Sequence, residues 1–174
     1  MPMREATAAD WPGLRPFFRD ICAAGETFTY PLHPTEEEAR AMWMPPASAP
    51  AHVVVAEEAG TVLGTAHMYA NRAGNGAHVA SASYMVDPAH QGRGAGRALS
   101  PTAWTGRARR ASAASSTTPS SRRTPPALAL YGDLGFEILG TLPEGFHHPR
   151  LGYVGLHSLH RALSRTGRAG AAVT

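Results

Sequence analysis

The stretch SYMVDPAHQGRGAGRAL, residues 83–99, decides the fold of this chain. It begins with apolar residues typical of a buried strand, breaks at Asp87-Pro88, and continues with three alternating glycines and two arginines. Glycine lets a ligand approach the backbone, and the first N–H groups of a helix attract anions. The stretch therefore predicts a strand, an anion-binding loop and a helix. Taken alone, the glycines are equally compatible with a flexible turn before a helix.

The segments before this loop predict an antiparallel run of strands preceded by two helices. Residues 52–58 and 61–70 are strand-like runs around a turn at Gly60, which predicts a hairpin. Thr35 followed by three glutamates is typical of a helix N-terminus. The expected elements, in order, are a strand over 3–8, helices over 11–24 and after Thr35, and strands over 52–58, 61–70 and 78–86.

The segments after the loop predict a helix over 127–134 and strands over 136–142 and 154–159, with a loop at His147-His148-Pro149 between these strands. The whole pattern is α+β, with a central, mostly antiparallel mixed sheet flanked by helices. We expect a single domain over residues 1–163 and a disordered tail over 164–174, where the residues are small and polar.

Composition narrows the class of protein. The chain has 174 residues, of which 43% are hydrophobic and 17% charged, as in ordinary soluble domains. The single cysteine excludes a disulfide within the chain, and no apolar run is long enough for a membrane span. The first residues lack the apolar core of a signal peptide. We therefore expect a cytoplasmic protein without a membrane partner.

Two motifs together resemble one known family. V-D-P-x-x-Q-G-x-G-x-G, from Val86 to Gly96, resembles the signature of the GCN5-related N-acetyltransferase (GNAT) superfamily. ALYGDLGFEILG, residues 129–140, resembles that family's later motif, in which a helix bearing a tyrosine leads into a strand. The resemblance covers about residues 3 to 162, with one gap.

The resemblance implies an acyltransferase that transfers an acetyl group from acetyl-CoA to a primary amine of a small molecule or a protein, without a metal. The amine attacks the thioester directly, so a general acid must protonate the CoA thiolate and a base must take the amine proton. Tyr131 is the implied acid, and we favour this role over the alternative of a core aromatic. Glu26 is a candidate base, with Glu57 or Glu58 as alternatives. The implied cofactor contacts are Tyr84, Met85, Val86, Gln91, Gly92, Arg93, Gly94, Ala95, Gly96 and Arg97.

Other functions compete with this interpretation. A degenerate GNAT module would bind acyl-CoA without turnover. Arginines at 107–110 and 122–123 could bind nucleic acid, but the arginine-only basic charge is more simply a coding bias, and we expect no nucleic-acid partner. A homodimer is compatible with the pattern. The aromatic residues Phe28, Tyr30 and Trp43 could shape an acceptor pocket or belong to the core.

Residues 100–126 depart from the family pattern. Apart from Trp104 they lack large apolar side chains and are rich in Ser, Pro and Arg, so composition predicts disorder where the family has a buried strand. When allowed codons for residues 104–126 are read two bases on, a permitted translation is DWARAAGFRGIQYNAVVETNTP. That string has a helix end, a turn and an alternating apolar strand. We hypothesise a pair of compensating frameshifts in the gene or its recorded sequence.

Overall fold

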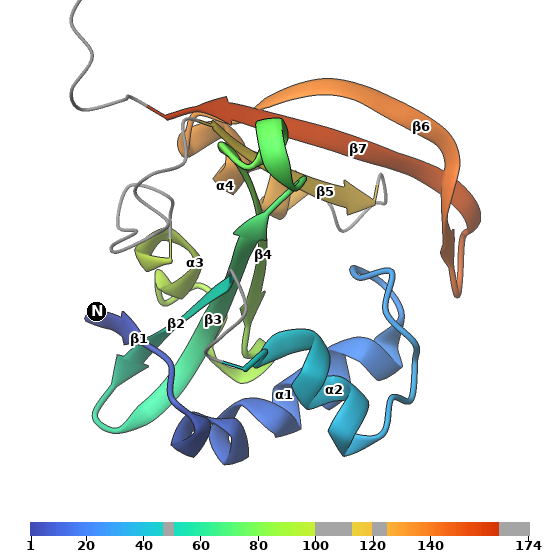
Figure 1. The fold of residues 1–174 in the computed structure, drawn as a ribbon. Helices are drawn as coiled ribbons and strands as arrows, with labels where there is room; N and C mark the ends of the chain where they lie inside the picture. The colour runs from blue at the N-terminus through green and yellow to red at the C-terminus, as the bar shows by residue number, and fades with distance from the viewer. Residues whose placement is uncertain (47–50, 100–112, 120–124, 164–174) are drawn as a thin grey trace, which may run out of the picture.

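A computed structural model of the chain describes residues 1–46, 51–99, 113–119 and 125–163 (Figure 1). The strands are β1 (Met3–Glu5), β2 (Ala51–Glu58), β3 (Thr61–Ala70), β4 (Val79–Val86), β5 (Ala113–Pro119), β6 (Glu137–His148) and β7 (Gly152–Ala162). The helices are α1 (Trp11–Ala24), α2 (Glu36–Trp43), α3 (Ala95–Ala98) and α4 (Pro125–Asp133), and short 3-10 turns cover Ala8–Asp10, Gly74–Gly76 and Pro88–His90.

The strands form one seven-stranded sheet in the order β1-β2-β3-β4-β5-β7-β6. β4 and β5 run parallel, whereas every other neighbouring pair is antiparallel. The predicted α+β class with a mostly antiparallel mixed sheet is therefore confirmed. β4 and β5 pair only from Val79–Ala113 to Ser81–Ser115. Beyond that short contact they diverge, so that Figure 1 shows the first four strands and the last three as two blades.

Helices cover both faces of the first blade. On one face, α1 and α2 bury Leu14, Phe18 and Trp43 against Val55 and Met85 of the sheet. The predicted helix over 11–24 is confirmed, because its apolar spacing turns one continuous stripe toward these strands. On the other face, α3 and α4 pack on a second cluster that reaches Phe136 and Leu159 of the second blade. The two clusters leave β3 and β4 buried between layers.

Two predictions about irregular segments are wrong. Residues 113–119 form β5 rather than a disordered stretch, because backbone hydrogen bonds to β4 and β7 hold this strand on both edges. Residues 100–112 and 120–124 of the same segment, and the predicted tail over 164–174, lie outside the described residues. His147 and His148 were expected in a loop, but β6 continues through them, since His147 pairs with Tyr153 and His148 with Gly152.

Among the described residues, no helix has both the length and the apolar character needed to cross a membrane.

The frameshift hypothesis predicts that the alternative translation stabilises the fold. At present β5 buries only small side chains such as Ala113 and Ser116. Replacing residues 104–126 with DWARAAGFRGIQYNAVVETNTP introduces isoleucine, tyrosine and valine, and each added buried methylene contributes about 0.8 kcal/mol. Each kcal/mol raises Tm by roughly 2–4 °C in a domain of this size, so scanning calorimetry should record an increase of at least ~5 °C. A shuffled version of the insert is the control, and an equal gain from it would contradict the hypothesis.

Candidate functional site

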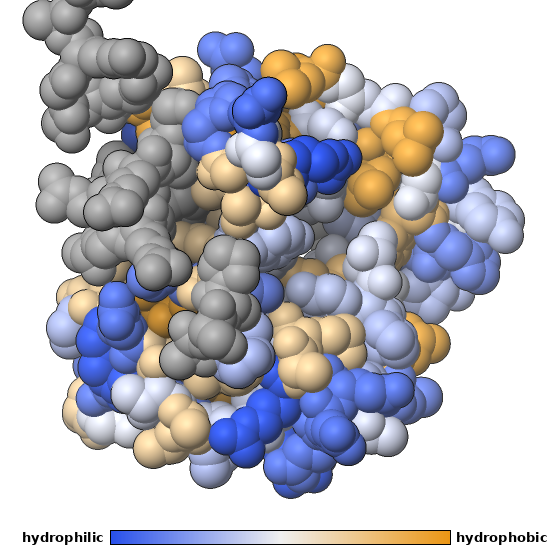
Figure 2. Space-filling view, viewed as in Figure 1, coloured by the Kyte–Doolittle hydropathy of each residue, from blue (hydrophilic) through white to orange (hydrophobic). Residues whose placement is uncertain are grey.

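The divergence of β4 from β5 creates the candidate site. β4 continues from Ala82 to Val86 after its last pairing with β5 at Ser81, so this flank of the strand has no strand beside it. Tyr84 and Val86 turn toward the α3–α4 face, and Met85 is buried toward α1 and α2. The surface is hollowed between the β6–β7 strands and the α1–α2 layer (Figure 2). An extended ligand can therefore pair with the exposed backbone of β4.

The glycine loop follows directly from this strand. The Asp87 carboxylate accepts a hydrogen bond from the Ala89 N–H at 2.9 Å and forms the turn out of β4. Gly92 and Gly94 adopt φ values of 80° and 86°, and a Cβ at either position would meet no atom within 4 Å. The first intrahelical hydrogen bond of α3 runs from the Ala98 N–H to the Gly94 carbonyl. The preceding N–H groups at the helix start therefore make no bond within the helix, as an anion site requires.

Gly96 has a different reason to be glycine. A Cβ there would lie 2.9 Å from Leu130 Cδ2 and 3.8 Å from Val86 Cγ2. Its missing side chain allows α3 to approach α4 closely. The structure thus gives Gly96 a packing role, whereas Gly92 and Gly94 line open space.

The two arginines of the loop are held in ion pairs. Arg93 pairs with Glu58 at the β2–β3 turn, and Arg97 pairs with Asp133 of α4 at 2.7 Å. All four side chains are about half exposed or more, and such surface pairs contribute little to stability. Both arginines can consequently exchange these partners for a bound anion.

Tyr131 lies where the two blades diverge. Its hydroxyl is 2.8 Å from Ser116 Oγ of β5, and its ring contacts Tyr84 and Phe136. Burial raises the pKa of Tyr131, so the hydroxyl remains protonated at neutral pH. The residue therefore packs in the core and also presents a proton donor at the divergence. Ser116, its partner, was not identified from the sequence because it lies in the segment expected to be disordered.

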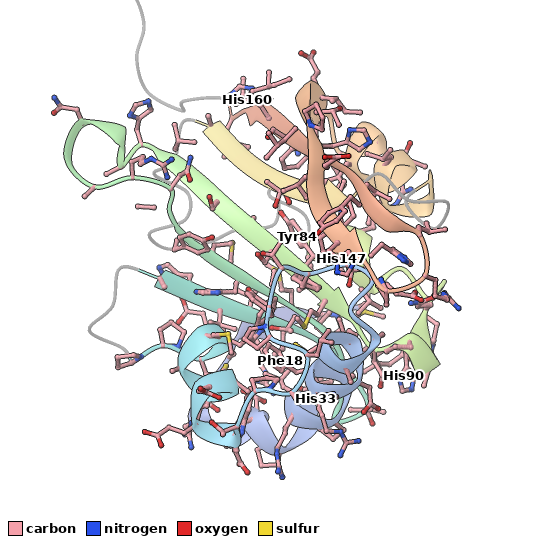
Figure 3. All side chains as sticks on the ribbon, turned by 90° about the vertical axis from the view of Figure 1, so that its right-hand side faces the viewer. Phe18, His33, Tyr84, His90, His147 and His160 are labelled. Carbon is pink, nitrogen blue, oxygen red and sulfur yellow. The ribbon has the colours of Figure 1, made fainter. Side chains whose placement is uncertain are left out.

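Tyr84 adds a second hydroxyl beside Tyr131. Its oxygen is buried and has no hydrogen-bond partner within the described part of the chain. Burial raises its pKa well above the usual value. Figure 3 labels Tyr84 on β4.

The three carboxylates proposed as bases are each engaged by an arginine. Glu26 pairs with Arg150, which joins the α1–α2 loop to the β6–β7 turn. Glu57 accepts a hydrogen bond from Arg4 Nε at 2.8 Å, and Glu58 holds Arg93. These contacts favour structural roles for the three acids.

The aromatic cluster divides between core and site. Trp43 is fully buried, and its indole N–H donates to Thr65 Oγ1 at 3.1 Å, so it belongs to the core. Phe28 and Tyr30 are half-buried and stack on each other, and the Tyr30 hydroxyl bonds to Ser83 of β4. These two rings therefore cover the α1–α2 face of β4.

His67 of β3 was missed by the sequence analysis. It is 8% exposed and contacts the rings of Trp43 and Tyr69. Desolvation by burial lowers the pKa of His67 from 6.5 to about 4, so the imidazole is neutral at physiological pH. The sequence offered one sign of this residue, which is a histidine within the strand-like run GTAHM, residues 64–68.

No metal centre is found in the described ranges, where no group of three or more His, Cys, Asp or Glu residues comes together. Figure 3 shows His33, His90, His147 and His160 on four different elements.

Comparison with known proteins decides the family. A model of the acetyltransferase (GNAT) domain matches residues 49–138, about half of the chain. A GCN5-related N-acetyltransferase from Kribbella flavida is 48% identical, with 93% of this chain and 97% of that chain covered at a TM-score of 0.85. This chain belongs to the GNAT family. It is accordingly an acyltransferase.

Other GNAT structures share the fold at lower identity. The ribosomal-protein-alanine N-acetyltransferase of Brucella melitensis is 25% identical, covering 94% of this chain and 100% of that chain at a TM-score of 0.77. YncA of Salmonella typhimurium, solved with its cofactor acetyl-CoA, is 23% identical, covers 99% of both chains at a TM-score of 0.80, and shows the fold alone. No protein in the curated set matches significantly.

The lowered pKa of His67 predicts a loss of stability in mild acid. The unfolded chain binds a proton at this residue near pH 6.5, whereas the folded chain binds it near pH 4. The free energy of unfolding should therefore fall as the pH drops from 6.5 to 4, by about 3 kcal/mol at most. Urea titrations across this window test the expectation. His67→Gln should flatten this dependence, and an unchanged slope in the variant would assign the loss to other groups.

Proposed function

We propose that this GNAT protein is an N-acetyltransferase that transfers an acetyl group from acetyl-CoA to a primary amine of a small molecule or a protein. The divergence of β4 from β5 directly before the glycine loop is the observation that carries the proposal. It leaves an unpaired strand flank next to a cluster of free N–H groups. These two features suit the extended pantetheine arm and the pyrophosphate of one ligand.

The residues present fit acetyl-CoA. The backbone of Tyr84, Met85 and Val86 would pair with the pantetheine amides, since β5 no longer occupies that flank. The pyrophosphate would meet the N–H groups of residues 91–96, where Gly92 and Gly94 leave space for it. Arg93 and Arg97 would add positive charge after leaving Glu58 and Asp133.

Tyr131 is the proposed general acid. When bound, acetyl-CoA supplies the thioester whose carbonyl carbon the neutral amine attacks. As the carbon–sulfur bond breaks, its electron pair goes to sulfur, and the Tyr131 hydroxyl gives up a proton at that atom. The raised pKa of Tyr131 keeps this proton in place until then. The half-buried rings of Phe28 and Tyr30 would orient the acceptor above β4.

A degenerate GNAT module that binds acyl-CoA without turnover is the alternative. The small side chains of β5 favour it, because Ala113 and Ser116, which are buried on this strand, offer little apolar surface beside β4. The engagement of Glu26 and Glu57 by arginines also deprives the site of two candidate carboxylate bases, whereas Glu58 would be released once Arg93 leaves it.

Gly94→Glu tests the cofactor loop. The new carboxylate would occupy the space and repel the pyrophosphate, so isothermal calorimetry should detect no acetyl-CoA binding. Gly74→Glu is the matched control, because Gly74 also has positive φ and open space around it but lies in the β3–β4 turn. Unchanged acetyl-CoA affinity in Gly94→Glu would contradict the proposed pyrophosphate site. Equal loss of affinity in both variants would indicate a nonspecific effect.

Tyr131→Phe tests the acid. General acids typically contribute 10²–10⁴-fold, so kcat should fall by at least about 10²-fold while acetyl-CoA affinity stays within about twofold. The rate can be followed by thiol release with a panel of primary amines. Ser116→Ala removes the hydrogen-bond partner but keeps the Tyr131 hydroxyl, so it should lower kcat much less than Tyr131→Phe does. Equal rates for Tyr131→Phe and the parent protein would leave Tyr131 as a core aromatic.

A further inference from the structure

His67 carries two buried polar atoms that nothing in the fold satisfies. Neither ring nitrogen has a hydrogen-bond partner within the described residues. A neutral imidazole presents one N–H donor and one acceptor nitrogen, so both functions are unused. Folded proteins rarely bury such groups unless a bound molecule or a chemical step completes them.

The position of His67 in the sheet connects it to the divergence of β4. His67 pairs with Ser83, the residue directly before Tyr84, and adjacent strands lie about 4.8 Å apart. The Tyr84 hydroxyl, on the opposite face of β4, is also buried without a partner, as is His52 Nε2 of β2, within the described residues. Unsatisfied polar groups thus flank β4 on both faces, at the point where its edge becomes free. His67 takes the face that Phe28 and Tyr30 cover.

The surroundings of His67 keep it neutral. Trp43 of α2 and Tyr69 of β3 contact its ring, at centroid distances of 5.7 and 5.1 Å. Two further titratable groups on this face are Tyr30 and Cys22, and burial raises their pKa values to about 12 and about 11. Desolvation alone accounts for the lowered pKa of His67, so no charged side chain of the described residues acts on it. One ring nitrogen of His67 therefore carries an unprotonated lone pair at neutral pH.

We infer that His67 is the general base that accepts the proton of the acceptor amine. This inference rests on the proposed acetyl transfer. The amine nitrogen forms a bond to the acetyl carbon, its proton passes to the free ring nitrogen of His67, and the sulfur that departs takes its proton from Tyr131. The nitrogen becomes strongly acidic once the new bond forms, so a weak base suffices. Uncharged surroundings also favour the neutral amine that direct attack requires.

Kinetics of His67→Gln test this role. Glutamine keeps hydrogen-bonding groups but cannot take a proton, so kcat/KM should fall at least about 10²-fold for the panel amine that the parent protein acetylates fastest. Acetyl-CoA affinity measured by calorimetry should stay within about twofold. His52→Gln is the matched control, because His52 lies on neighbouring β2 and pairs with Met68, on the opposite face of the sheet. It should leave kcat/KM unchanged.

A second variant separates a chemical role from a structural one. His67→Ala leaves a cavity, and added imidazole should restore activity in a saturable manner, with substituted imidazoles of higher pKa restoring more. Activity of folded His67→Gln within about threefold of the parent, or His67→Ala activity that imidazole does not restore, would overturn the base assignment while the acetyl transfer stands. Acetyl-CoA binding by the parent protein without turnover of any panel amine would overturn both.

Discussion

The short parallel contact between β4 and β5 is the constraint on which the rest of the structure depends. It consists of three residue pairs, and the strands on either side of it belong to antiparallel blades with their own pairing. Because each blade is held by its own hairpins, the two can diverge without losing their hydrogen bonds. The divergence frees one flank of β4 and aims the strand end at the glycine loop. It also brings Tyr131 and Ser116 to the junction.

Burial sets the charge state of the site. Desolvation disfavours charged forms, so it raises the pKa values of Tyr30, Tyr84 and Tyr131 and lowers that of His67. Every one of these groups is neutral at physiological pH. The carboxylates of Glu26, Glu57 and Glu58 are engaged by arginines instead. A neutral site suits an amine that must attack without its proton, whereas Arg93 and Arg97 would bind the phosphate groups of the proposed acetyl donor.

The spacing of apolar residues along the sequence predicted the helices and strands in which that spacing is regular. The helix over 11–24 and the hairpin around Gly60 have the expected bounds within a residue, because their spacing is continuous. β5 could not be predicted, since its residues are small or polar and its stability comes from partners distant in sequence. The packing role of Gly96 and the isolation of His67 also depend on distant residues, Leu130 and Trp43. The sequence thus predicted the glycine loop and the aromatic cluster, but not the contacts of Gly96 and His67 with residues distant in sequence.

The composition of β5 affects the two halves of the site unequally. An extended ligand would pair with the backbone of β4, and this pairing does not depend on the side chains of β5. Small residues in β5 would therefore leave the proposed acetyl-CoA site intact. The Tyr131 hydroxyl, in contrast, is oriented by the side chain of Ser116 on that strand. A less stable second blade would therefore disturb the orientation of the Tyr131 hydroxyl before it disturbs the part of β4 that would bind acetyl-CoA. Binding of acetyl-CoA and its turnover are consequently separable properties of this chain, and each must be measured.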